Sequence, residues 1–207
     1  RKECAMNLQT ADWLLCSGNG RLSRRIKQYN RLMSVKGAAA EITHIALIAD
    51  GGKAVFESTT LNKWAGKRGT QVNSFYEWLR NYDGSVWHRH LEFERTECFE
   101  IDFAAEIGEL IDRPYENGIP GLLELMFCGI EWDWFRRTFR IDQKLRTVEL
   151  HCTEASAILL QNTDLLRRVN PDTNHPVRPD KLPPYMWWEK GFVETMMRVK
   201  VYPPVLL

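Results

Sequence analysis

The residue in this sequence best suited to covalent chemistry is Cys152. It stands where a short β-prone run, residues 147–150, gives way to apolar residues at helical spacing, so we expect a helix that begins near Thr153. A thiol at a helix N-terminus lies near the positive end of the helix dipole and near unpaired backbone N–H groups, which favour the nucleophilic thiolate. Cys152 is therefore a candidate nucleophile. The alternative is a small core residue, because free cysteine is often buried.

A nucleophilic thiol needs a base, and the sequence offers His44 in its clearest predicted strand, residues 42–50. The turn signal Gly51-Gly52 follows, and residues beyond it return as a second strand. With a two-residue turn, Glu57 lies on the same face as His44, as a diagonal neighbour about 7–8 Å away at Cα. A carboxylate and an imidazole can meet across that separation.

This histidine–carboxylate pair has two interpretations. It is either a base with its orienting carboxylate or a buried ion pair that serves the fold. We favour the first, because burying such a pair costs desolvation energy that an apolar pair would not.

Two further histidines, His88 and His90, alternate onto one face of a strand predicted over residues 85–91. They could ligate a metal, but no third ligand is evident nearby in the sequence, and thiol chemistry requires no cofactor. We therefore predict no metal and no cofactor. The cysteines form no CxxC pair, which argues against structural zinc; they are Cys4, Cys16, Cys98, Cys128 and Cys152.

Length and composition predict one globular domain. The chain has 207 residues, 44% hydrophobic and 27% charged, with a net charge of +1 that gives no case for nucleic-acid binding. A basic cluster over residues 21–36 is interpreted as a solvated helix face in preference to a polyanion or lipid-headgroup contact. No apolar run reaches bilayer length, so no transmembrane segment is expected. The odd number of cysteines favours reduced thiols and a cytoplasmic location.

These candidate residues must be positioned by alternating strands and helices. We expect a core over residues 10–168 and a proline-rich arm with a C-terminal strand over residues 169–207. The predicted strands are 10–16, 42–50, 53–59, 85–91 and 192–201, and the predicted helices are 22–33, 73–82, 103–111 and one that begins near 153.

Five short motifs occur in a characteristic order along the chain. This order resembles the circularly permuted branch of the NlpC-type papain-like cysteine hydrolases, the YiiX-like family, in which the histidine strand precedes the cysteine. The resemblance implies an α+β fold, a permuted papain-like domain whose central antiparallel sheet packs against the cysteine helix. The motifs are Asp-Trp-Leu-Leu from Asp12, Thr-His-Ile-Ala-Leu-Ile from Thr43, Val-Phe-Glu-Ser from Val55, Arg-Pro-Tyr-Glu from Arg113 and His-Cys-Thr-Glu from His151.

The resemblance assigns roles to individual residues. It implies that Cys152 is the nucleophile, His44 the general base and Glu57 the group that orients the imidazole. Ala11 replaces the usual glycine and Arg113 lies within the turn motif, which affects the pocket more than the triad. The residues implied for the substrate pocket are Asp12, Tyr115 and Thr153.

The implied function is a thiol hydrolase that cleaves an amide bond through an acyl-enzyme, with a cell-wall peptide as the family-typical substrate. A lipid-directed acyltransferase or a fatty-amide or ester hydrolase is an alternative, because the aromatic stretch through Trp132 and Trp134 suits an acyl chain. A catalytically silent binding or structural module on the same fold is the other alternative, since fold alone does not imply activity. The expected partner is a peptide or acyl-amide substrate.

Overall fold

The computed structural model describes residues 7–32, 34–62, 67–114, 152–179 and 182–207. Its centre is a six-stranded sheet in the order β4-β3-β2-β1-β5-β8, in which every neighbouring pair is antiparallel. Strands β6 and β7 form a second, two-stranded sheet. The strands are β1 (Trp13–Gly18), β2 (His44–Ala49), β3 (Ala54–Asn62), β4 (Lys67–Ser74), β5 (Gly84–Arg89), β6 (Leu91–Glu92), β7 (Lys200–Val201) and β8 (Val205–Leu206).

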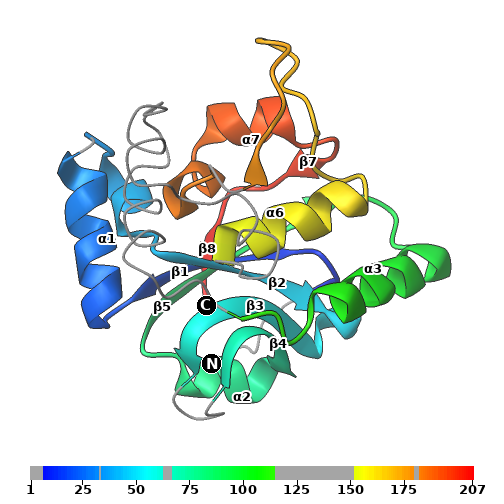
Figure 1. Ribbon diagram of the computed structural model, residues 1–207, viewed down its shortest axis with the longest axis horizontal. Helices are drawn as coiled ribbons and strands as arrows, with labels where there is room; N and C mark the ends of the chain where they lie inside the picture. The colour runs from blue at the N-terminus through cyan, green and yellow to red at the C-terminus, as the bar shows by residue number, and fades with distance from the viewer. Residues whose placement is uncertain (1–6, 33, 63–66, 115–151, 180–181) are drawn as a thin grey trace.

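Helices cover both faces of the large sheet (Figure 1). On one face α3, α6 and α7 enclose the larger hydrophobic core, which contains Trp13, Leu47 and Phe56. On the other face α2 covers a smaller cluster around Trp78. The described chain is thus an α+β structure with an antiparallel sheet, as predicted. The helices are α1 (Arg21–Leu32), α2 (Phe75–Asn81), α3 (Glu97–Leu110), α6 (Cys152–Asn162) and α7 (Lys190–Met196), with 3-10 turns η1 (Gly37–Glu41), η2 (Asp50–Gly52) and η5 (Pro184–Trp187).

The β2–β3 hairpin has the predicted register. Ala46 pairs with Glu57 and Ala49 pairs with Ala54, so the alternation of faces is the one expected from a turn at the two glycines. The turn needs left-handed backbone at Gly51 and Gly52, with φ of 57° and 96°. Glycine adopts this conformation without steric penalty, which explains why a short turn can form here.

Two predictions at other places need correction. Residues 192–201 were predicted as one strand, but α7 covers the stretch as far as Met196 and only Lys200–Val201 forms a strand, β7. Val193 and Met196 are buried at a spacing of three, which suits a helix. Strand β4 was not predicted, because its alternation is inverted. Polar Gln71 and Asn73 point inward, whereas Val72 is exposed.

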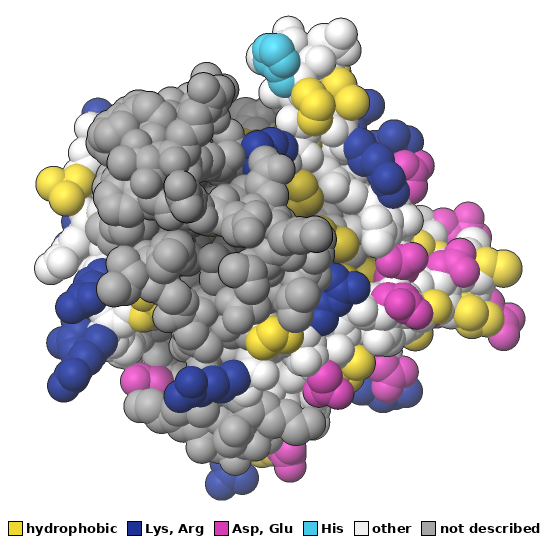
Figure 2. Space-filling view, in the orientation of Figure 1, with side chains coloured by type: hydrophobic (Ala, Val, Ile, Leu, Met, Phe, Trp, Pro, Cys, Tyr) yellow, Lys and Arg dark blue, Asp and Glu magenta, His cyan; other side chains and the backbone are white. Residues whose placement is uncertain are grey.

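The basic cluster predicted from the sequence forms α1, along one edge of the molecule. Arg21, Arg24 and Arg25 are exposed, and Figure 2 shows blue side chains gathered on the side where α1 lies. Arg31 pairs with Glu41 at 2.6 Å. These contacts fit a solvated helix face. None of the helices in the described ranges is long and apolar enough to cross a membrane.

Candidate active site

The imidazole of His44 and the carboxylate of Glu57 meet as the hairpin register predicts. His44 begins β2, two residues before Ala46, the partner of Glu57, so both side chains leave the sheet on the same face. The Nε2 atom of His44 lies 2.9 Å from Oε2 of Glu57. Glu57 is buried and His44 is largely so. The pair is therefore shielded from water, which strengthens its electrostatic interaction.

Strand β4 contributes two residues that the sequence analysis missed. Gln71 Nε2 donates to Oε1 of Glu57 at 3.1 Å, and Asn73 Nδ2 donates to the same oxygen at 3.3 Å. Both side chains are amides, so they satisfy the second carboxylate oxygen without adding a charge. The inverted polar–apolar alternation of residues 71–73 is the signal that could have identified them.

Cys152 completes a three-membered arrangement. It is the first residue of α6, which packs on β2 and β3, and its side chain is buried. Burial by itself lowers the pKa of His44, but the charge and side-chain hydrogen bond of Cys152, and then those of Glu57, raise it to about 10. The imidazole therefore interacts with both the thiol and the carboxylate. Because Nε2 faces Glu57, Nδ1 is the ring nitrogen left for the sulfur.

The structure describes two of the three residues predicted for a substrate pocket, and only one of them lies beside Cys152. Thr153 is the second residue of α6, directly beside Cys152, and is fully buried. Tyr115 lies outside the described residues. Asp12 directly precedes β1, whereas Cys16, the β1 partner of His44, lies four positions further on. At about 3.3 Å per residue this separates Asp12 from the triad by roughly 13 Å along the strand.

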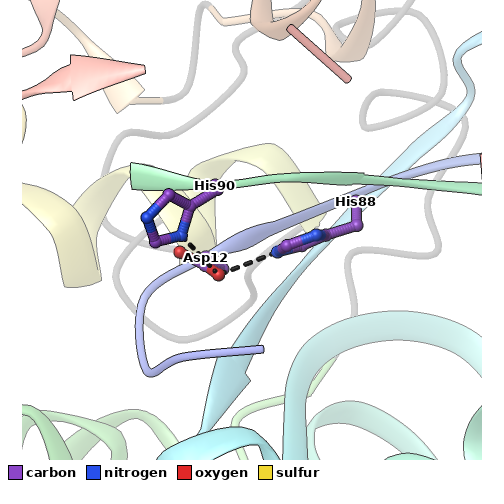
Figure 3. A group of neighbouring side chains, drawn as sticks. All are labelled: Asp12, His88 and His90. Atoms are coloured by element: carbon purple, nitrogen blue, oxygen red, sulfur yellow. Dashed lines mark hydrogen bonds and ion pairs between the residues drawn. The ribbon is translucent and has the colours of Figure 1, made fainter. Parts of the chain in front are cut away.

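Asp12 instead organises a second polar cluster, between β1 and the end of β5. Its Oδ2 atom lies 2.8 Å from Nε2 of His88 and 3.2 Å from Nδ1 of His90 (Figure 3). The two histidines lie on one face, as predicted, because they are two residues apart, and both contact the same oxygen of Asp12. The third potential ligand that the sequence did not reveal is therefore Asp12, 76 residues before His88.

The other oxygen of Asp12 has its own donors. Oδ1 accepts from Nη2 of Arg95 at 2.7 Å and from the backbone N–H of Leu91 at 3.0 Å. Burial raises the pKa of Asp12, but these bonds, the two histidines and the charge of Arg95 lower it below its ordinary value overall. Asp12 is therefore a buried, ionised residue whose hydrogen bonds connect the start of β1 with the turn after β5.

Comparisons with known proteins find similarity among solved structures. No family model matches the chain, and no curated protein matches it. The structure aligns with the crystal structure of metalloprotein YiiX from Escherichia coli O157:H7, a DUF1105 protein, over 97% of this chain and 97% of that one. The TM-score is 0.49 and the sequence identity is 13%. A similarity of this size carries no inference about function.

Proposed function

We propose that this protein is a thiol hydrolase that cleaves an amide bond, with Cys152 as nucleophile, His44 as general base and Glu57 as the group that orients the imidazole. The observation that carries the proposal is that His44 interacts with both the thiol of Cys152 and the carboxylate of Glu57. Activated thiols typically show this order of contacts, in which the nucleophile meets a base and the base meets an orienting carboxylate.

The elevated pKa of His44, about 10, supports a protonated imidazole in the resting state. The reacting form of Cys152 in the proposed mechanism is the thiolate. The thiolate attacks the carbonyl carbon of the amide and forms a C–S bond. The backbone N–H of Cys152, at the start of α6, is a natural donor to the oxyanion. His44 gives its proton to the leaving nitrogen as the C–N bond breaks. Water then attacks the thioester, His44 takes a proton from it, and the acid leaves as the thiolate re-forms.

The fold we propose for this chemistry is a circularly permuted papain-like one. Two features support it: the nucleophile begins a helix that packs on the sheet, and the histidine strand comes earlier in the chain than the cysteine. By the resemblance of its motifs to the YiiX-like branch, we propose a cell-wall peptide as the substrate. A fatty amide or ester is the alternative that the same triad could serve.

The first test is the reactivity of the cysteines. We expect iodoacetamide to label Cys152 faster at neutral pH than Cys98, which is exposed, and than Cys16, which is buried in the sheet. The rate for Cys152 should fall in His44→Ala, whereas the rate for Cys98 should not change. Mass spectrometry of the labelled peptides measures each site separately. If Cys152 labels no faster than Cys98 and shows no dependence on His44, the thiol is not activated and the proposal is wrong.

The second test concerns the substrate. Purified protein and its Cys152→Ser variant are incubated with defined muropeptides and, separately, with N-acyl amides of matched charge. If the wild-type protein releases a new amine from the muropeptides and Cys152→Ser does not, the peptide assignment is supported. Release only from the acyl amides keeps the hydrolase proposal and overturns the cell-wall substrate.

A further inference from the structure

The cluster around Asp12 brings three metal-ligating atoms to one point. We propose that Asp12, His88 and His90 bind one divalent transition-metal ion of the zinc class, independently of the proposed triad. The Asp12 Oδ2 atom and the facing nitrogens of the two histidines all lie within 4.8 Å of one another (Figure 3). Among the residues that the structure describes, no other group of three His, Cys, Asp or Glu side chains is arranged in this way.

The distances are close to those of a coordination sphere. An ion bound tetrahedrally at about 2.0–2.2 Å holds neighbouring ligand atoms about 3.3–3.6 Å apart. The two separations from Asp12, 2.8 Å to His88 and 3.2 Å to His90, are shorter than the lower end of this range by about 0.5 Å or less. Small shifts of the two rings would therefore complete the geometry. The side chain of His90 is 31% exposed, so it has room to turn.

The donor set selects the class of ion. Two imidazoles and one carboxylate suit zinc and its first-row neighbours, whereas magnesium and calcium prefer oxygen ligands. Three protein ligands also leave a coordination position for water, as in open zinc sites. His90 is the more exposed of the two histidines and therefore marks the side from which solvent and metal arrive.

The carboxylate ligand is already oriented by outer contacts. Arg95 and the backbone N–H of Leu91 hold Oδ1, so Oδ2 is turned toward the two rings. Such outer partners fix the geometry of metal ligands. The positive charge of Arg95 offsets the charge of Asp12, so we expect an ion that a chelator removes readily.

Hydrogen bonding alone explains the contacts of the Asp12 Oδ2 atom less well than those of Oδ1. Oδ2 is approached by three nitrogens, those of His88, His90 and the backbone of Gln9, the last at 3.2 Å. One carboxylate oxygen has two lone pairs, so three N–H donors exceed its capacity. A metal ion among these atoms would let both rings contribute lone pairs instead of competing as donors.

X-ray absorption of zinc-loaded, unmodified protein tests the ligand set without any substitution. We expect nitrogen and oxygen scatterers at about 2.0–2.1 Å and an imidazole signature, with no sulfur at about 2.3 Å. A sulfur scatterer would place the ion on a cysteine such as Cys152 and overturn the proposal.

Calorimetric titration with Zn²⁺ tests the individual residues. The protein is treated with chelator and carries Cys152→Ser, so the proposed nucleophile cannot supply a thiolate. We expect one ion per chain, and binding weaker by at least about tenfold in His88→Gln and in His90→Gln. The control is His175→Gln, because His175 is exposed on the arm.

Circular dichroism identifies variants that fail to fold. If a variant fails to fold, X-ray absorption of the unmodified protein still tests whether the ion is bound by these ligands. Unchanged zinc affinity in the folded His90→Gln variant, or equal loss in His175→Gln, would refute the site. Neither result bears on the hydrolase proposal, because the substitutions leave His44 and Glu57 intact.

Discussion

The two buried carboxylates that meet histidines in this protein are balanced by different kinds of charge. Asp12 accepts from the guanidinium of Arg95, whose side chain is only 8% exposed. Glu57 accepts from the neutral amides of Gln71 and Asn73 on one oxygen and from His44 on the other. An arginine keeps its charge at any ordinary pH, whereas an imidazole can lose its proton.

This difference separates a carboxylate that has a permanent counter-charge from one whose counter-charge can be lost. The negative charge of Asp12 is held by a permanent cation, so the cluster stabilises the joint between β1 and the turn after β5. The negative charge of Glu57 faces a titratable ring, which in the proposed mechanism would let His44 give and accept a proton. Substitutions at each cluster test this difference.

The largest expected effect is on stability, at Asp12. Asp12→Asn removes the counter-charge of buried Arg95, so we expect the free energy of unfolding to fall by about 3–5 kcal/mol in urea titrations of chelator-treated protein. The matched Glu57→Gln variant should lose only about 1–2 kcal/mol, because His44 can become neutral instead. Equal losses in the two variants would contradict the distinction between the clusters.

The next effect is on catalysis, at Glu57. We expect Glu57→Gln to lower kcat/KM for the amide substrate about 100-fold, equivalent to about 2.7 kcal/mol, because the imidazole loses its orienting charge. The pKa of His44, measured by NMR of the ring, should fall below the wild-type value of about 10 because Glu57 helps to raise it. Glu41→Gln is the control, since Glu41 pairs with arginine away from the triad. A Glu57 variant with wild-type kcat/KM would exclude the orienting role.

A smaller effect is expected at the amides behind the carboxylate. Gln71→Leu removes one donor to Glu57, and we expect kcat/KM to fall roughly fivefold, about 1 kcal/mol, with KM unchanged. The control, Val72→Thr, alters the outward-facing neighbour on the same strand. If both substitutions reduce kcat equally, the loss reflects damage to β4 and not the hydrogen bond to Glu57.

The last expected effect is a pH dependence of stability. The pKa of His44 is raised from 6.5 in the unfolded chain to about 10 in the fold, so its contribution is fully present below pH 6.5. That contribution is lost as the pH rises through about 10. Urea unfolding at several alkaline pH values should show this decline in wild-type protein and a flatter profile in His44→Gln. Identical profiles would mean that His44 is not held in its charged form.

The arrangement of His44, Glu57 and Cys152 can be predicted from the sequence better than the cluster around Asp12, because its contacts are more local. His44 and Glu57 belong to one hairpin, so a turn signal and the alternation of side chains were sufficient to predict their shared face. The role of Cys152 at a helix start was also a local inference. Gln71 and Asn73 were missed because β4 buries its polar residues, which inverts the pattern by which strands are predicted.

Local periodicity and turn chemistry are sufficient to predict the α+β class, the hairpin register and the beginning of the cysteine helix. The surroundings of Asp12, in contrast, depend on the tertiary structure. Its partners are 76 residues away at His88 and 83 at Arg95, and they meet it through the pairing of β1 with β5. No local signal specifies which distant strands become neighbours, since that choice depends on how the whole core packs.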